Sequence, residues 1–248
     1  MSTSVARENI AFIGLGHLGR HLATSLLKAG FKLAVYDLDE KAAAPLIERG
    51  ARFASTPKAA ALGADVVITC LPSPAATEAV MTGDDGVLLD PAPGTIWIEM
   101  STNDPEAIHG LAALAREKGV ATLEAPVTGG VHKAESGEIT VLVGGDEAVF
   151  EAHRPLFEAM GGEVIHMGAL GQASVIKVIT NMLAFIHLVA AGEALMLART
   201  ADLDLTKTFR AIKASSGNSF VHETESQVIL NGSYNIGFTL DLALKDLA

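Results

Sequence analysis

Cysteine and aromatic residues are scarce in this sequence. Cys70 is the single cysteine, so the chain cannot form an internal disulfide or a metal site built from several cysteines. Cys70 follows the apolar run 66–69, which favours a buried structural thiol over a nucleophile. Aromatic residues make up 5% of a chain that is 49% hydrophobic. We therefore expect a largely aliphatic core, as in helices packed on a buried parallel sheet.

Positive charge is also in short supply. Lys and Arg number 18 against 29 for Asp and Glu, which gives a formal charge of −11. Without a basic cluster, such a surface repels nucleic acid and anionic membranes, so we expect neither as a partner. The eight histidines show no metal-ligand spacing, so no metal site is predicted. Residues 1–9 resemble neither a signal peptide nor a transit sequence, and the cytoplasm is the expected compartment.

The first two thirds of the chain alternate between short β-like runs and helical patterns. This alternation predicts βαβ units and a doubly wound, mostly parallel sheet with helices on both faces. The expected strands are 10–13, 32–36, 66–69, 95–99, 121–124, 139–143 and 163–166. The expected helices are 18–29, 40–49, 57–62, 75–81, 105–118 and 147–160.

From residue 171 the chain is predicted to be all helical. Helices are expected at 173–200, 205–215, 223–230 and from 239. The uncharged stretch 178–192 is closed by Lys177 and Glu193, too early for a span of about 20 apolar residues, so it reads as a buried helix. We predict a dinucleotide-binding domain at 1–170 and a helical domain at 171–248. The last helix has no stop signal, so we expect the chain to continue past Ala248.

A glycine motif opens the first domain. Gly14-Leu15-Gly16-His17-Leu18-Gly19 follows an apolar strand and begins a helix. Gly14 permits the tight turn, Gly16 lets a pyrophosphate approach the backbone, and Gly19 allows close packing of helix and strand. The helix N-terminus then offers N–H groups to phosphates. The alternative is a structural glycine turn without a ligand.

Asp37 stands about 20 residues beyond the glycines, where a carboxylate binds the ribose hydroxyls of NAD and repels the 2′-phosphate of NADP. Leu38 occupies the place where a phosphate-binding arginine could stand. NAD is therefore the expected cofactor, with NADP less favoured. Alternatively, Asp37 caps the helix that starts near Glu40.

Two further patterns have weaker meanings by themselves. Thr128-Gly129-Gly130 follows a proline and offers a concave anion site, but a plain turn has the same composition. Lys177 and Asn181 are spaced i, i+4 on one helix face. A lysine among apolar neighbours is more often a snorkelling surface residue than a catalyst.

Taken together, these segments resemble the β-hydroxyacid dehydrogenases, the group that includes 3-hydroxyisobutyrate dehydrogenase, tartronate semialdehyde reductase and 6-phosphogluconate dehydrogenase. The matching segments, in chain order, are 12–19, 70–72, 100–102, 125–130, Gly171 with Lys177 and Asn181, and Phe238 with Lys245 and Asp246. The sequence departs from the family pattern at Leu18, Glu124 and Thr128, where methionine, aspartate and serine are commoner. The interval from Gly171 to Lys177 is also longer than in many members.

The resemblance implies a role for each segment. Lys177 would be the general acid/base, and Thr128, Gly129, Gly130 and Asn181 would bind the substrate. The implied cofactor-binding residues are Gly14, Leu15, Gly16, His17, Leu18, Gly19, Asp37, Leu71, Pro72, Thr102, Phe238 and Lys245. The implied reaction is hydride transfer between NAD and a short, 3-hydroxyisobutyrate-like hydroxy acid. Members are commonly homodimers or homotetramers joined through the helical domain.

Three alternatives remain open. An NADPH-dependent reductase of tartronate, succinic or glyoxylate semialdehyde would share the same catalytic residues, and Asp37 weighs against it. An imine reductase would usually carry aspartate or tyrosine where Lys177 stands. A non-catalytic dinucleotide-binding scaffold is a different class of protein, which Lys177 and Asn181 disfavour. Residues 215–220 are predicted to help select the substrate, although a helix-capping loop explains them equally well.

Overall fold

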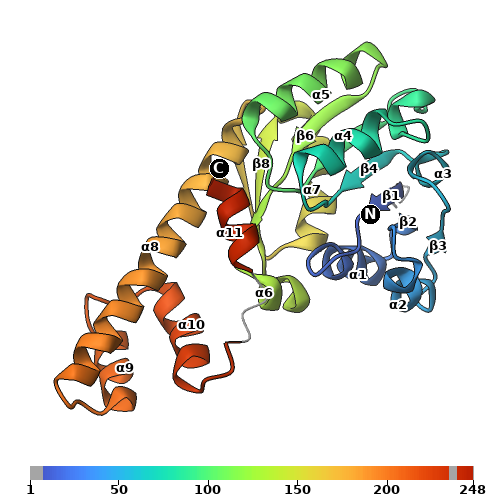
Figure 1. Ribbon diagram of the computed structural model, residues 1–248. Coiled ribbons are helices and arrows are strands. Elements are labelled where there is room, and N and C mark those ends of the chain that lie inside the picture. The colour runs from blue at the N-terminus through green and yellow to red at the C-terminus, as the bar shows by residue number, and fades with distance from the viewer. Residues whose placement is uncertain (1–7, 235–238, 248) are drawn as a thin grey trace, which may run out of the picture. The chain divides into compact units, whose positions relative to one another are not determined.

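The computed structural model describes residues 8–234 and 239–247. The chain divides into two compact units, Met1–Lys177 and Val178–Ala248, which are described separately. The boundary predicted from the sequence, at 170/171, falls directly before the long helix α8 (Gln172–Thr200) and stays a prediction. Figure 1 shows α8 as one continuous helix that begins in the first unit and continues into the second.

The first unit is built on a mostly parallel sheet, as predicted. Its described strands follow the order β3-β2-β1-β4-β5-β6-β8-β7, with β9 paired to β8. Pairing is parallel from β3 through β6, antiparallel where β8 meets β6 and β7, and parallel again between β8 and β9. The strands are β1 (Asn9–Ile13), β2 (Lys32–Tyr36), β3 (Arg52–Phe53), β4 (Val66–Thr69), β5 (Ile96–Glu99), β6 (Ala121–Glu124), β7 (Val127–Thr128), β8 (Thr140–Gly145) and β9 (Glu163–Gly168).

Helices cover both faces of this sheet. They are α1 (Gly19–Ala29), α2 (Ala44–Ile47), α3 (Pro57–Ala61), α4 (Pro74–Thr82), α5 (Pro105–Glu117), α6 (Val131–Ser136) and α7 (Glu147–Met160), with short 3₁₀ turns η1 (Glu40–Ala43) and η2 (Val87–Leu89). Ile10 and Phe12 of β1 belong to one hydrophobic core, and Ala11 and Ile13 to the other. Because side chains alternate along a strand, residues 10–13 of β1 must all be apolar to be buried on both faces, whereas Asn9 at its start is exposed.

Several predicted boundaries needed correction. The helix expected over 40–49 is split into η1 and α2 at Pro45. Proline has no N–H to donate, and its ring would clash with the carbonyl one turn earlier in a continuous α-helix. The short strands β3 and β7 and the helix α6 were not predicted. Each is too short to produce a periodic hydrophobic pattern.

The second unit is helical in the residues described, as predicted. After α8 it contains α9 (Leu205–Lys213), α10 (Phe220–Leu230) and α11 (Leu240–Leu247). The helix α10 begins three residues earlier than predicted, because the Ser219 hydroxyl caps it by accepting from the N–H of His222 at 3.0 Å. By length and composition alone, α8 qualifies as a candidate membrane span, although only 11% of its most apolar 18 residues are buried. The buried helix predicted over 178–192 is therefore wrong for the described structure, because apolar side chains such as Ile186 and Val189 are 54% and 62% exposed.

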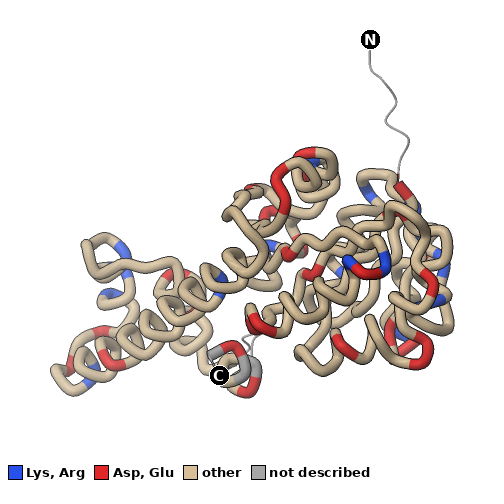
Figure 2. The backbone as a smooth tube through the Cα atoms, turned by 90° about the horizontal axis from the view of Figure 1, so that it is seen from above, with Lys and Arg blue, Asp and Glu red and all other residues tan. Residues whose placement is uncertain are grey.

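Figure 2 shows the charged residues along the described chain. Lysines and arginines are spread over several elements, and acidic residues lie between them. The described ion pairs are few and lie at exposed or half-buried positions, such as Lys213 with Glu223 at 2.7 Å. Exposed pairs of this kind contribute little to the free energy of folding, so the described ion pairs are a minor source of stability in either unit.

Candidate active site

The glycine motif forms a turn that admits no side chain at two positions. Gly14 has φ +97°, and its N–H donates to the Tyr36 carbonyl at 2.9 Å. A Cβ on Gly14 would lie 2.3 Å from the Cys70 carbonyl oxygen, and one on Gly19 would lie 2.1 Å from the Gly14 oxygen. Both contacts are far below van der Waals separation. Gly14 therefore holds β1 against the end of β4, and Gly19 holds α1 against the turn.

Gly16 differs from the other two glycines. It is exposed, and a Cβ at this position would meet nothing within 4 Å. Within the described chain, the N–H groups of Gly16, His17 and Leu18 donate no hydrogen bond. Open space beside unpaired donors at a helix N-terminus fits a phosphate group, because the donors and the helix dipole both favour negative charge. These residues therefore fit the pyrophosphate of a dinucleotide.

Asp37 lies against the same loop. One carboxylate oxygen accepts a hydrogen bond from the Leu15 N–H at 2.6 Å, and the other accepts from the Asp39 N–H at 2.9 Å. The helical turn η1 is capped by Asp39, which accepts from the N–H of Lys41. The alternative role of Asp37 as a helix cap is therefore wrong. Each Asp37 oxygen keeps a further lone pair that a ribose hydroxyl can use.

A buried hydrogen-bond network joins the loops after β4 and β5. The Leu71 N–H donates to the Ser101 hydroxyl at 2.8 Å, and the Ser101 N–H donates to Glu99 at 2.6 Å. On the other side, Thr69 donates to Glu99 at 2.6 Å and accepts from the Trp97 indole at 2.8 Å. Burial raises the pKa of Glu99, although hydrogen bonds from Ser101 and Thr69 oppose that change. Leu71, Pro72 and Thr102 are thus carried on loops that share one support.

Thr128 and the glycines after it lie where an antiparallel strand pair ends. Thr128 is the last residue of β7 and pairs with Thr140 of β8. Gly129 and Gly130 have φ values of +121° and +85°, which other residues rarely adopt. The sequence predicted either an anion-binding loop or a plain turn at 128–130. The first residue of this loop, Thr128, is held in the sheet by β7. Gly130 is followed directly by α6.

Lys177 and Asn181 both lie on α8, one turn apart. Lys177 is half-buried, whereas Asn181 is buried and donates from its amide to Asp246 of α11 at 2.7 Å. Asp246 is itself buried, although α11 is only eight residues long. The resemblance placed Asp246 in a C-terminal motif expected to reach the cofactor, of which only Phe238 and Lys245 were predicted to bind it. Phe238 lies outside the described residues, and so does the side chain of Lys245.

The structure thus brings part of the predicted site together. Close packing joins Gly14 of the glycine turn to Cys70, and a hydrogen bond joins Leu15 to Asp37. A further hydrogen bond joins Leu71 to Ser101, on the loop that carries Thr102. These loops all follow the carboxyl ends of parallel strands, where ligands bind in doubly wound folds. Asn181 belongs to the second unit, so its approach to Thr128 stays a prediction.

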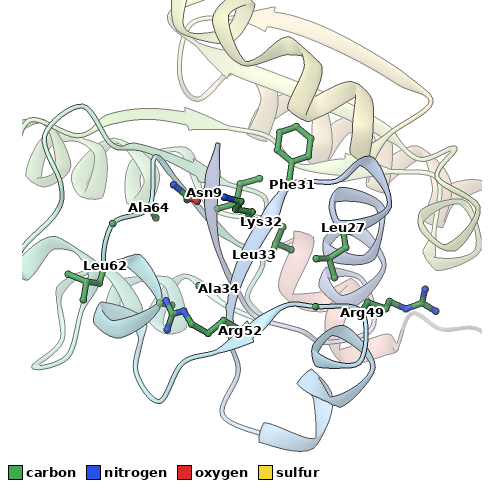
Figure 3. A pocket seen from close by; sticks show the side chains of 14 residues that line it. Asn9, Leu27, Phe31, Lys32, Leu33, Ala34, Arg49, Arg52, Leu62 and Ala64 are labelled. Carbon is green, nitrogen blue, oxygen red and sulfur yellow. The ribbon is translucent and has the colours of Figure 1, made fainter. Parts of the chain in front are cut away.

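One hollow lies at the opposite edge of the sheet. It has a volume of about 530 Å³ and is lined by the amino ends of β1 and β2 and by Arg49 and Arg52 (Figure 3). Figure 3 shows these two arginine side chains extending in different directions, so they do not converge on one ligand. The glycine turn, Asp37 and Lys177 are not part of its lining. We regard this hollow as a groove between surface elements.

A smaller hollow of about 260 Å³ lies within the second unit. Its lining includes His187 of α8, residues 216–219 and His222 of α10. Residues 215–220 were predicted either to select the substrate or to cap a helix. Ser219 does cap α10, and Asn218 donates to Glu223 at 2.7 Å. The capping role is confirmed, and substrate selection stays a prediction.

Known proteins resemble both parts of the chain. Residues 9–168 match the NAD binding domain of 6-phosphogluconate dehydrogenase, and residues 171–248 match the NAD-binding domain of NADP-dependent 3-hydroxyisobutyrate dehydrogenase. An NAD-dependent L-serine dehydrogenase of Pseudomonas aeruginosa is 40% identical over 97% of this chain and 83% of its own length.

Solved structures give the same result. The Mycobacterium tuberculosis 3-hydroxyisobutyrate dehydrogenase with L-serine has a TM-score of 0.86 and 33% identity, over 97% of this chain and 84% of that one. A protein named Psf3, in complex with NADP⁺ and 2-OPP, has a TM-score of 0.89 and 28% identity over 96% of this chain and 84% of that one. With its glycine turn, strand-end loops and helical second unit, the chain belongs to the β-hydroxyacid dehydrogenase family, whose enzymes use NAD(P) to act on the CH–OH group of hydroxy acids.

Proposed function

We propose that this enzyme transfers a hydride between NAD and a short 3-hydroxy acid, with Lys177 as the general acid/base. The observation that carries the proposal is the pairing of Lys177 with Asn181 on α8. Lys177 is half-buried and Asn181 is buried, so neither side chain is simply solvated. A lysine whose role was only to snorkel would need no buried amide one turn away on the same face.

The chemistry divides between cofactor and protein. When bound, the nicotinamide supplies the hydride acceptor or donor. Lys177 removes the proton from the substrate hydroxyl during oxidation and returns it during reduction. Asn181 orients the substrate through its amide, while the Thr128 hydroxyl and the N–H groups of Gly129 and Gly130 hold the substrate carboxylate. Because the carboxylate is bound at one place, only one carbon of the substrate chain lies next to Lys177. We propose that this is carbon 3, which carries the hydroxyl.

NAD is the proposed cofactor. Asp37 is held beside the glycine turn by its contact with the Leu15 N–H, and this contact supports our assignment of its carboxylate to the adenosine ribose. A 2′-phosphate would have to approach that charge, and the neighbouring Leu38, 93% exposed, offers no compensating cation. One similar family domain and the Psf3 complex are described with NADP, so cofactor preference needs its own measurement.

The substrate is proposed from the relatives' names together with this site. L-serine and 3-hydroxyisobutyrate are both three-carbon chains with a carboxylate and a 3-hydroxyl, and they differ at carbon 2. The runner-up is the reverse activity, reduction of a tartronate, succinic or glyoxylate-type semialdehyde with NADPH. A non-catalytic dinucleotide-binding scaffold is the alternative of another class.

We further propose a homodimer or homotetramer in the cytoplasm, joined through the helical unit. On α8 the side chains of Val189, Met196 and Leu197 are 62%, 61% and 72% exposed. Apolar exposure of this extent along one helix is typical of a surface that another chain covers. The charges of Lys177 and Glu193 within α8 favour that explanation over burial in lipid.

The test is NADH formation from L-serine, 3-hydroxyisobutyrate and related short 3-hydroxy acids, with NAD and NADP compared in parallel. We expect NAD-dependent turnover of at least one substrate. K177M should lower kcat by about 10²-fold or more, because general acid/base catalysis contributes about that much, while the Kd for NAD stays within about twofold. Full turnover by K177M would reject the role of Lys177. Tight NAD binding with no turnover of any substrate would favour the scaffold.

A further inference from the structure

We propose that Glu124 is a positioning residue for Lys177: its carboxylate fixes the first turn of α8 to the strand that leads into the substrate loop. The proposal rests on the function proposed above, in which Lys177 moves the proton. Glu124 does not touch the reacting atoms in this account. It acts through α8, by the hydrogen bonds that it accepts at the start of that helix.

The first turn of α8 has no cap from its own sequence. Gly171 precedes the helix with φ +93° and has no side chain. Its carbonyl accepts from the Val175 N–H at 3.1 Å, and the Gln172 N–H donates to the Ala169 carbonyl at 3.1 Å. The N–H groups of residues 173 and 174 then need partners, because no earlier helical carbonyl is available to them.

Glu124 supplies both partners. The Ala173 N–H donates to one carboxylate oxygen at 2.9 Å, and the Ser174 N–H donates to the other at 3.2 Å. The Ser174 hydroxyl donates to that second oxygen as well. All three side chains are at most 2% exposed. A carboxylate at a helix N-terminus is also favoured by the helix dipole, so the contact is both directional and electrostatic.

The surroundings leave room for this carboxylate and little else. A Cβ on Gly144 of β8 would lie 2.4 Å from a Glu124 oxygen and 3.0 Å from its Cγ. Gly144 pairs with Glu124 across the antiparallel β6–β8 contact. Glu124 is therefore held on one side by the backbone of β8 and on the other by the first turn of α8.

Other helices in the first unit are capped differently. Thr56, Ser73, Asp104 and Asp146 each accept from a backbone N–H three residues later in their own helix. Such a cap moves with its helix and ties it to nothing else. Glu124 lies 49 residues from Ala173 in sequence, on a different element, so it restrains α8 relative to β6.

The restraint connects α8, which carries Lys177, to the segment that carries Thr128. Along α8, Lys177 is three residues beyond Ser174, which is one helical turn. In the chain that follows β6, Thr128 is four residues beyond Glu124, and β7 holds it in the sheet. One carboxylate thus sets the position of the proposed base relative to the proposed substrate loop. A displacement of about 1 Å at such a distance from the chemistry can lower turnover about 10²-fold.

The test uses E124Q in the full chain, with L-serine or 3-hydroxyisobutyrate, whichever is turned over faster. A glutamine keeps one acceptor oxygen but directs an NH₂ group at a backbone N–H of the first turn. We expect kcat to fall at least tenfold, while the Kd for NAD changes less than twofold. Amide hydrogen exchange at residues 173–175 should become faster. E124D, whose shorter carboxylate cannot reach both N–H groups, should give an intermediate kcat and keeps the test valid if E124Q fails to fold.

Two controls separate positioning from simple loss of stability. D146A removes an ordinary helix cap from α7; it should lower Tm by about 2 to 4 °C and leave kcat unchanged. E124Q should also have less than a twofold effect in the K177M background, because a residue that acts through Lys177 has nothing left to position there.

Each outcome has one meaning. A wild-type kcat for E124Q and E124D, with K177M inactive, overturns the positioning role and leaves the proposed function standing. Equal fold losses from E124Q in the Lys177 and K177M backgrounds also overturn it. Wild-type turnover by K177M rejects the proposed function itself and the role of Glu124 with it.

Discussion

The Asn181 amide donates a hydrogen bond to the carboxylate of Asp246 at 2.7 Å, and both side chains are buried. The two residues are 65 positions apart, so this bond holds α11 against α8 within the second unit. An amide that donates from its nitrogen to Asp246 has its oxygen oriented by the same contact. In the proposed mechanism, Asp246 therefore selects which end of the Asn181 amide the substrate meets.

Removal of the Asp246 carboxylate should disturb that orientation. We expect D246A to lower kcat/KM about 5- to 50-fold, and to reduce the free energy of unfolding by about 1 to 3 kcal/mol because a buried amide loses a partner. Steady-state kinetics and urea unfolding check the two effects. As a control, D241A alters an exposed residue of the same helix and should leave kcat/KM unchanged. A D246A enzyme with wild-type kcat/KM would contradict the role given to Asp246.

Because the space beside Gly16 is open, a substitution there should change NAD binding without changing the stability of the fold. G16A should fold as the wild type does, because the new methyl group meets no protein atom within 4 Å. It should nevertheless weaken NAD binding by tenfold or more, because the methyl group occupies the approach of the pyrophosphate. Thermal unfolding and NAD titration measure these quantities.

A matched substitution is available in α5. G110A also adds a methyl group into open space, but inside an exposed helix turn, where it should raise stability by about 0.5 to 1 kcal/mol without changing the Kd for NAD. If G16A bound NAD as tightly as G110A does, the glycine turn would not be the phosphate site.

Cofactor choice is predicted to depend on Asp37. D37S removes the charge that opposes a 2′-phosphate and keeps a hydroxyl beside the glycine turn. We expect the ratio of kcat/KM for NAD to that for NADP to fall about tenfold or more, mainly through a better KM for NADP. D39S changes an exposed carboxylate two residues away, and its serine can still cap η1, so the ratio should not move. An unchanged ratio in D37S would remove Asp37 from cofactor selection.

Stability should depend on pH through Glu99. Burial raises the pKa of Glu99 above its ordinary value of 4.5, so the folded state holds this proton at pH values where the unfolded state has released it. Between 4.5 and the folded pKa, the folded state therefore binds more protons, and this group makes the protein less stable as pH rises. Each unit of pKa shift corresponds to about 1.4 kcal/mol.

E99Q tests that dependence directly. A glutamine can accept from the Ser101 N–H and donate to Thr69, and it does not titrate. The free energy of unfolding of E99Q relative to the wild type should increase as pH is raised from 4.5, and then level off above the folded pKa. Urea unfolding at a series of pH values measures the difference. Parallel curves for the two proteins would mean that the pKa of Glu99 is the same in both states.

Much of the first unit could be predicted because its signals are local. The apolar runs of β1, β2 and β4 give strands, and the glycine spacing gives the turn, since both depend on neighbouring residues only. Asp37 could be placed for the same reason, at a known distance past the glycines. The pairing of Lys177 with Asn181 follows from helical geometry alone.

The remaining features depend on contacts that sequence spacing does not encode. Glu124 caps a helix 49 residues away, and Glu99 joins loops contributed by two strands. Each looked like an ordinary strand-end residue. The antiparallel pairing of β8 with its neighbours could not be predicted either, because β7 has only two residues and produces no hydrophobic pattern. A glutamate as the last residue of a predicted strand, as at 99 and 124, is the one sequence signal that could have pointed to these two residues.

Gly144 has a consequence for how this enzyme can change over evolution. A Glu124 oxygen occupies the space that a side chain at position 144 would need. An alanine at 144 would therefore require a shorter residue at 124, or a different conformation of the glutamate. Residues 124, 144 and 174 therefore form a covarying set: among relatives, we expect a change at one to be accompanied by a change at another. A chain that exchanged Glu124 for aspartate could then admit an alanine at 144, with a shift of a few tenths of an ångström at the Ala169 carbonyl, whose oxygen would lie 3.1 Å from the new Cβ.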